Sequence, residues 1–236
     1  ASIDLPAFKA ALLPAESSKD IQYLNAQRLQ RLTTQLHHFS GITPCTIPDG
    51  LQASLREYQQ QGLSWLRFLR DFGLGGILAD DMGLGKTLQT LALLLSLKQS
   101  GELEHPALIV CPTSLLGNWL AEAARFTPQL RVLQIHGHKR QPLFNELADY
   151  DLIVTSYPLV IRDHKFYQQQ PLAAVILDEA QHIKNAGSQA AKAVRLLRAR
   201  HAALVELKLA ALENGSLHAG AVDGPVLTPG ALPYAF

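Results

Sequence analysis

Short apolar runs that alternate with helical segments dominate the sequence after residue 75. Five runs, each of four or five mostly apolar residues, lie at 76–79, 107–111, 131–135, 151–155 and 174–177. Helix-like segments, such as 86–97 and 115–125, stand between them. Strands that read as continuous apolar runs are typical of a parallel sheet buried on both faces. The pattern therefore predicts an α/β fold in which helices flank a parallel sheet on both faces.

The segments on either side of this block have a different character. Residues 20–39 carry apolar side chains at close to helical spacing, and a cluster of glycine and proline over 41–50 follows. We therefore expect a helical N-terminal extension and linker over 1–50 and the α/β lobe over 51–203, beginning with a helix near 55–69. Residues 188–212 are rich in alanine, leucine and basic residues, which predicts a helix. The tail over 204–236 should be helical at first and then loosely ordered.

Composition narrows the class of protein without naming a partner. The 236 residues suffice for one sizeable domain, and the net charge of +1 indicates no global attraction to nucleic acid. The two cysteines form no disulfide framework, and the histidines at 136, 138 and 164 form no metal-ligand pattern. The longest apolar run, 91–95, is too short for a membrane span. We expect a soluble, cytoplasmic protein.

A glycine-rich turn joins the first apolar run to the helix after it. Residues 82–87 read Met-Gly-Leu-Gly-Lys-Thr, and such glycines let backbone N–H groups face phosphate oxygens at a helix N-terminus. Lys86 would supply a charge to the β and γ phosphates, and Thr87 a hydroxyl to Mg²⁺. A strict P-loop would have glycine where this chain has Asp80. The alternative is a glycine-rich turn before an ordinary helix.

Two adjacent carboxylates, Asp178 and Glu179, directly follow the last apolar run. Two acids on a loop are usually no more than solvated charges. These two, however, stand at the carboxyl end of a predicted buried strand, where parallel α/β sheets bind ligands. We predict that Asp178 faces Mg²⁺ and that Glu179 polarises the attacking water.

Several segments, in order, resemble the motifs of Swi/Snf-type ATPases of helicase superfamily II, bacterial branch. Residues 77–87 resemble the first motif, whose relaxed first glycine accounts for Asp80, and 178–182 resemble the second. Residues 55–59 resemble the adenine-reading segment. The resemblance implies the first of two RecA-like lobes, with Lys86, Asp178 and Glu179 as catalytic residues and Mg-ATP as the cofactor. It implies nucleotide contacts from Gln59, Asp80, Asp81, Met82, Gly83, Leu84, Gly85, Lys86 and Thr87.

The same resemblance implies a site for double-stranded DNA. Residues 111–119 and 154–157 resemble motifs Ia and Ib, which lie on the nucleic-acid side of the motor in relatives. The residues predicted to contact DNA are Thr113, Ser114, Asn118, Thr155 and Ser156. A local basic cluster at 136–140 is either a further DNA contact or a solvated loop. The relatives' location implies the bacterial cytosol or nucleoid.

The chain departs from the family pattern beyond residue 201. Relatives continue with a strand and a Thr-Gly-Thr-Pro-like turn, which should begin near Ala202 but does not appear. We therefore expect residues beyond 204 to replace a sheet strand with helix or disorder. The resemblance also implies a second lobe, a partner that is missing here, which supplies arginines that stabilise the transferring phosphate. Without such arginines the rate of ATP hydrolysis can fall roughly 10³- to 10⁵-fold.

Three functions remain open from the sequence. The first is the ATP-binding lobe of a DNA-dependent ATPase and translocase that binds Mg-ATP but hydrolyses it poorly alone. The second is a truncated nucleotide- or DNA-binding module without significant hydrolysis. The third, a kinase or transport ATPase, is disfavoured because the segments at 58–59 and 178–181 are helicase-like.

Overall fold

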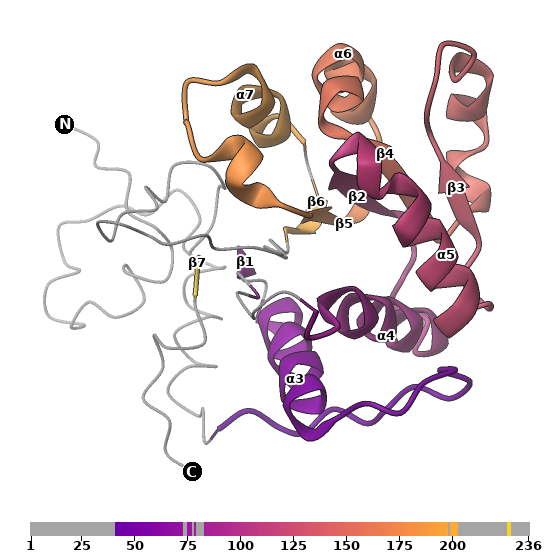
Figure 1. Cartoon of the computed structure of the whole chain (residues 1–236), viewed down its shortest axis with the longest axis vertical. Coiled ribbons are helices and arrows are strands. Elements are labelled where there is room, and N and C mark those ends of the chain that lie inside the picture. Colours follow the sequence, from indigo (N-terminus) through magenta and orange to yellow (C-terminus); the bar gives the residue numbers. More distant parts are fainter. Residues whose placement is uncertain are drawn as a thin grey trace, which may run out of the picture.

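A parallel sheet forms the centre of the protein. In the computed structural model, residues 41–72, 75–76, 78, 83–197, 199–202 and 226–227 are described. The sheet has five strands in the order β3-β4-β2-β5-β6, and all neighbouring strands are parallel. The strands are β2 (Ala107–Cys111), β3 (Val132–Gln134), β4 (Leu152–Ser156), β5 (Leu172–Leu177) and β6 (Ala199–Ala202). The predicted parallel α/β fold is confirmed (Figure 1).

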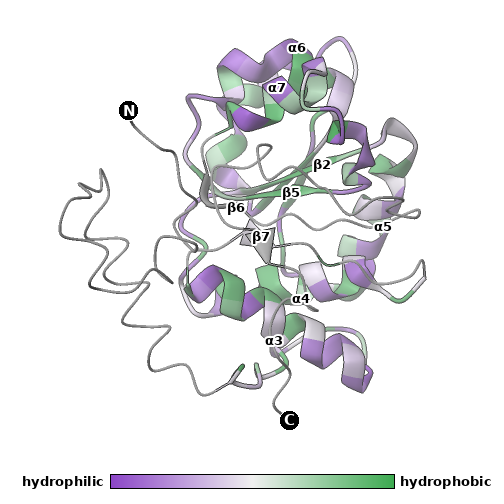
Figure 2. Ribbon diagram, turned by 90° about the vertical axis from the view of Figure 1, so that its left-hand side faces the viewer, coloured by the Kyte–Doolittle hydropathy of each residue, from purple (hydrophilic) through white to green (hydrophobic). Residues whose placement is uncertain are grey.

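Helices cover both faces of the sheet. On one side lie α3 (Glu57–Asp71), α4 (Lys86–Gln99) and α5 (Leu116–Phe126), and on the other α6 (Tyr157–Tyr167) and α7 (Gln189–Arg195). Figure 2 shows β2 and β5 as apolar and much of the outer helical surface as polar. Four 3₁₀ turns, η2 (Thr113–Leu115), η3 (Gln141–Asn145), η4 (Leu147–Asp149) and η5 (Ala180–Ile183), shape the connections between these elements.

The alternation of side chains along each strand builds two separate cores. In β2, Ala107, Ile109 and Cys111 pack with α3, α4 and α5, whereas Leu108 and Val110 pack with α6 and α7. Successive side chains of a strand point to opposite faces, so a continuous apolar run fills both cores at once. This explains why the strands show no alternation of apolar and polar residues.

Strand register brings three chain segments to one edge of the sheet. Cys111 at the end of β2 pairs with Ser156 at the end of β4, and Val110 pairs with Leu177 at the end of β5. The backbone N–H of Asp178 then donates to the Val110 carbonyl over 2.9 Å. The residues that follow these strands therefore meet at the carboxyl edge, where ligands bind in folds of this class.

The strand before the glycine-rich turn pairs in an unexpected way. We predicted a strand over 76–79, and the structure has β1 (Gly75–Gly76) in a parallel pair with β7 (Val226–Leu227), apart from the five-stranded sheet. Gly76 permits a close approach to α3, because a Cβ there would fall 2.1 Å from Leu69 Cδ1. Residues 77 and 79 lie outside the described residues.

The helix predicted over 188–212 is wrong at 199–202, and residues 203–212 of that prediction lie outside the described residues. Helix α7 covers Gln189–Arg195 only, and β6 pairs with β5 in the registers Leu172 to Ala199 and Ala174 to His201. The exposed edge of β5 offers a row of backbone partners, and pairing with it overrides the local helical tendency. The sequence predicted no strand at 199–202, so β6 is a strand that it missed. The expectations for 1–40, 203–225 and 228–236 fall outside the described residues.

No helix within the described segments is long and apolar enough to cross a membrane.

Candidate functional site

The glycine-rich turn and the start of α4 form one wall of the candidate site. Gly83 and Gly85 have φ angles of 81° and 75°, in the left-handed region that glycine favours. The N-cap residue, Gly85, makes no side-chain cap. The first N–H groups of this long helix therefore point into the turn together with the positive end of its dipole. Lys86, the first helical residue, is only 4% exposed. Asp80, Asp81 and Met82 lie outside the described residues.

Gln59 connects the start of α3 to this turn. Its Oε1 accepts a hydrogen bond of 2.9 Å from the Arg56 backbone N–H, and its Nε2 donates one of 3.0 Å to the Leu84 carbonyl. A Cβ on Gly85 would lie 2.5 Å from Gln59 Nε2, so a side chain there would displace the end of Gln59, and the positive φ of Gly85 separately favours glycine. The structure thus places Gln59 beside the turn. Its contact with adenine stays a prediction.

Asp178 is buried at the end of β5 and is held at three points. Its Oδ2 accepts a hydrogen bond of 2.7 Å from Trp119 Nε1, and its backbone carbonyl accepts one of 2.9 Å from the Tyr157 hydroxyl. The third is its own N–H on the Val110 carbonyl. Oδ1 is buried and makes no hydrogen bond of good geometry to any described residue. A carboxylate oxygen left in this state is poised for an additional ligand.

The electrostatics of Asp178 reflect its burial. Desolvation raises its pKa to about 6, and the negative charge of Glu179 acts in the same direction. The Trp119 hydrogen bond, the Glu179 backbone N–H and the positive charge of Lys86 lower the pKa but do not outweigh burial. The charge of Lys86 therefore reaches Asp178, although the two residues lie far apart in the sequence.

Glu179 differs sharply from its neighbour. It is the only non-glycine residue with a positive φ in the described chain, at φ 54° and ψ 52°. This conformation costs roughly 1 kcal/mol or more and is typical of functional sites. It also turns the side chain away from the core, so Glu179 is half-buried and its Oε2 accepts a 2.7 Å hydrogen bond from Gln181 Nε2. Adjacent carboxylates thus occupy different environments, which suits different roles.

Three residues of the site were not assigned to it from the sequence. Trp119 and Tyr157 hold Asp178, and Glu122 of α5 lies beside Thr87. Burial raises the pKa of Glu122, against hydrogen bonding with Thr87 and the charge of Arg125. A buried indole N–H or phenol hydroxyl signals a need for a partner. Only the folded chain could show that Asp178, 59 residues from Trp119, is that partner.

The residues predicted to contact DNA divide into two groups. Thr113, Ser114 and Asn118 are exposed on η2 and the first turn of α5. Thr155 and Ser156 are 0% and 1% exposed, and the Thr155 hydroxyl donates to the Ile135 carbonyl over 3.1 Å. These two side chains complete the core instead of facing solvent, so the structure offers no surface for them to contact a phosphate.

One residue of the basic cluster at 136–140 is buried in the protein interior. Arg140 is 6% exposed. Its guanidinium donates to both Asp163 carboxylate oxygens over 2.6 and 2.8 Å, and to the Gly137 carbonyl over 2.8 Å. Arg140 therefore ties this loop to α6. His136, His138 and Lys139 are exposed, as in a solvated loop.

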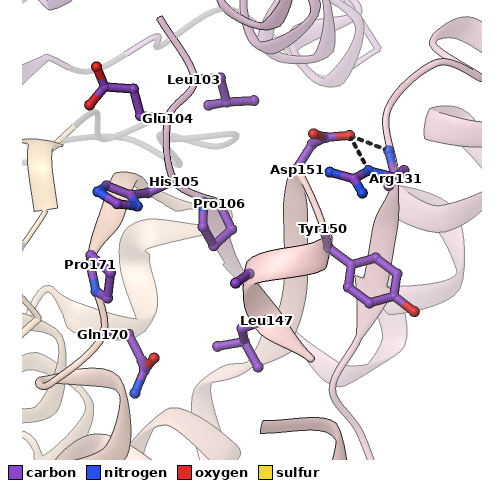
Figure 3. Close-up of a pocket in the computed structure, with 11 residues that line it drawn as sticks. Leu103, Glu104, His105, Pro106, Arg131, Leu147, Tyr150, Asp151, Gln170 and Pro171 are labelled. Carbon is purple, nitrogen blue, oxygen red and sulfur yellow. Dashed lines mark hydrogen bonds and ion pairs between the residues drawn. The ribbon is translucent and has the colours of Figure 1, made fainter. Parts of the chain in front are cut away.

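A small cavity lies at the opposite, amino edge of the sheet (Figure 3). Its volume is about 140 Å³, and its lining residues precede β2, β3, β4 and β5. At its side, Asp151 Oδ2 accepts a hydrogen bond of 2.7 Å from the Arg131 backbone N–H, as Figure 3 shows. The same oxygen accepts one of 2.7 Å from Lys98 Nζ. The cavity is separate from the carboxyl edge, and Asp151 at its side joins α4, β3 and β4.

Comparison with known proteins decides the family. The family model of the SNF2-related domain matches residues 58–206. The chain belongs to this family. The predicted resemblance to Swi/Snf-type ATPases is therefore confirmed. The described site lies within the matched segment, because it runs from Gln59 to Gln181.

Curated relatives of this SNF2-related domain are much longer proteins. The chain is 37% identical over 193 residues to the putative ATP-dependent helicase/translocase YwqA of Bacillus subtilis, covering 80% of the chain and 21% of that protein. It is 39% identical over 211 residues to the chromatin-remodeling ATPase INO80 of Cryptococcus neoformans, covering 84% and 11%. The domain thus spans about a fifth or less of these relatives.

A solved structure confirms the fold of the SNF2-related domain. The SWI2/SNF2 ATPase core of Sulfolobus solfataricus in complex with dsDNA superposes with a TM-score of 0.66 at 38% identity. The match covers 71% of this chain and 34% of that chain. The RecA-like lobe predicted from the sequence is therefore confirmed.

Proposed function

We propose that this SNF2-related domain is the ATP-binding lobe of an ATP-dependent double-stranded DNA translocase. The observation that carries the proposal is that Lys86, at the start of α4, lies near enough to Asp178, at the end of β5, for its charge to act on that carboxylate. Both side chains are buried, and the charge of Lys86 lowers the pKa of Asp178. A buried cation and a buried carboxylate beside an open helix N-terminus suit a phosphate group and its metal.

Different residues of the site would bind different parts of Mg-ATP. The backbone of 83–87 would cradle the phosphates, Lys86 would bind the β and γ phosphates, and the predicted Asp80, Asp81 and Met82 would complete the loop. Gln59 would bind the adenine from its place beside the loop.

Thr87 and Asp178 are the residues that would hold Mg²⁺. The chemistry of the donor set fits a hard cation, because both offer oxygen and Oδ1 of Asp178 is buried without a partner among the described residues. When bound, the ion neutralises charge on the phosphates. Glu179, the half-buried neighbour, would take the catalytic role of orienting and polarising the attacking water.

We propose that this lobe acts on double-stranded DNA. The solved SWI2/SNF2 core that it resembles is bound to dsDNA. We assign DNA contacts to Thr113, Ser114 and Asn118, which are exposed on η2 and α5. Small polar side chains on such turns commonly bind phosphates. We leave Thr155 and Ser156 out of this surface because they are buried.

Full turnover is proposed to need a second RecA-like lobe. The domain, which we place over 51–203, corresponds to 34% of the solved ATPase core. Because a second lobe would supply the arginines that stabilise the transferring phosphate, we expect slow hydrolysis by this lobe alone. With a Bacillus subtilis relative as a guide, we place the protein in the bacterial cytosol or nucleoid.

Replacement of Lys86 tests the nucleotide site directly. Lys86→Ala should weaken binding of Mg-ATP about 100-fold, because a charged hydrogen bond to the phosphates is lost. Calorimetric titration would measure this. Lys192→Ala, which removes an exposed lysine of α7, is the matched control and should bind as the parent does. Parent-like affinity in Lys86→Ala would remove the phosphate-loop assignment.

A further inference from the structure

The hydrogen bond from Trp119 holds Asp178 in place and occupies only one of its two carboxylate oxygens. The indole Nε1 lies 2.7 Å from Oδ2, and both residues are 2% exposed. A short bond from a neutral donor to a buried carboxylate is directional and charge-assisted. It fixes which carboxylate oxygen is occupied and leaves Oδ1, the oxygen without a partner among the described residues, as the open one.

The second tryptophan of the chain shows that burial of an indole does not by itself produce such a bond. Trp65 of α3 is 5% exposed, and its Nε1 has no hydrogen-bond partner within the described part of the chain. The contact at Trp119 is therefore specific to its position opposite Asp178. Trp65 also offers a control for the loss of a buried indole.

We propose that Trp119 is a positioning residue of the metal site, whose indole N–H holds the Asp178 carboxylate so that Oδ1 faces the cation. This inference rests on the proposed function, since it concerns the Mg²⁺ of Mg-ATP. Groups that orient a metal-binding carboxylate typically contribute 10- to 100-fold to metal affinity or activity.

The same contact links the metal site to the surface proposed for DNA. Trp119 directly follows Asn118 on the first turn of α5. Tyr157, the first residue of α6, holds the Asp178 carbonyl from the other side and stacks on His182 at a ring distance of 4.9 Å. A shift of the start of α5 would therefore move the donor that orients Asp178.

The test compares Trp119→Phe with Trp65→Phe in the full chain. Trp119→Phe removes the N–H while keeping an aromatic ring, and Trp65→Phe removes an indole N–H that makes no bond to the site. Binding of a non-hydrolysable ATP analogue would be titrated calorimetrically with Mg²⁺ and again with EDTA. We expect Trp119→Phe to raise the Mg²⁺ concentration for half-saturation about 10- to 100-fold. Affinity in EDTA should stay within about twofold, and Trp65→Phe should change neither.

The outcomes separate the inference from the proposed function. A parent chain that binds no nucleotide with Mg²⁺ would overturn both. A parent that binds, with Trp119→Phe retaining the same Mg²⁺ requirement, would overturn the inference alone. Equal losses with Mg²⁺ and with EDTA would also overturn it, because a general disruption of the site, and not the metal, would then be responsible.

A spectroscopic measurement avoids dependence on the folding of Trp119→Phe. In Trp65→Phe, Trp119 is the only tryptophan, because the chain has two. Addition of Mg²⁺ to the complex with the ATP analogue should shift the Trp119 emission, since its hydrogen-bond acceptor becomes a metal ligand. Emission that is unchanged by Mg²⁺ under saturating nucleotide would contradict the proposal.

Discussion

Two neighbouring carboxylates show how backbone conformation separates chemical roles. Asp178 continues the line of β5 and is buried, whereas the left-handed backbone of Glu179 turns the next side chain toward solvent. The sequence identified both residues by their place after an apolar run. It could not show that Asp178 is buried while Glu179 is only half-buried, because the burial of Asp178 depends on Trp119 and Tyr157, which approach from distant segments.

Asp178 should reduce the stability of the free chain at neutral pH. Its pKa is about 6 in the folded chain against an ordinary value of 3.8, so the folded state binds more protons than the unfolded state between these values. Stability therefore falls as pH rises from about 4 to 6, by up to about 3 kcal/mol. Asp178→Asn should thus be more stable than the parent at pH 8 and equal to it near pH 4.

Urea unfolding at both pH values, without nucleotide or Mg²⁺, would measure this difference. Asp149→Asn, at an exposed position of η4, is the matched control and should match the parent at both. An Asp178→Asn variant less stable than the parent at pH 8 would show that the buried carboxylate is well solvated or paired in the free chain.

At the scale of elements, apolar runs predicted β2 to β5 and glycine predicted the phosphate turn, because these signals are local. The strand β6 could not be predicted in the same way. Residues 199–202 read Ala-Arg-His-Ala, without the apolar run that marked the other strands. They form a strand because the edge of β5 pairs with their backbone. Long-range pairing of this kind leaves little trace in the local sequence.

Asp151 is expected to hold three elements together at the amino edge. Burial alone would raise its pKa, but hydrogen bonds from Lys98 and from Arg131 outweigh it and leave the pKa lowered. Because the pKa of Asp151 is lower in the folded state, its charge stabilises the fold at pH values above its unfolded-state pKa. This stabilisation is lost as the pH falls through the folded-state pKa. Asp151→Asn should therefore lose about 1–3 kcal/mol of unfolding free energy at pH 7, and much less near pH 3.

The same urea unfolding series would test Asp151→Asn, again beside Asp149→Asn. Its pH dependence should be opposite in sign to that of Asp178→Asn, although both changes remove one buried or nearly buried carboxylate. A loss of stability that is the same at pH 3 and pH 7 would indicate a packing defect in place of lost charge pairing.

At the scale of the whole molecule, the sheet separates two cores. The described residues proposed to bind ATP lie at the carboxyl edge of the sheet or on α3 and α4 beside it. This arrangement was predictable because parallel strands align their carboxyl ends. The surface proposed to contact DNA was less predictable from the sequence. Small polar residues after strands looked alike in the sequence, yet Thr113 and Ser114 are exposed while Thr155 and Ser156 fill the interior.

The most direct test is ATP hydrolysis by the purified chain, with and without duplex DNA, beside calorimetric binding of Mg-ATP. The account predicts saturable, Mg²⁺-dependent binding together with slow hydrolysis that DNA does not stimulate, because the second lobe supplies the arginines for turnover. Absence of nucleotide binding would contradict the assignment of the site. Rapid, DNA-stimulated hydrolysis would contradict the need for a second lobe.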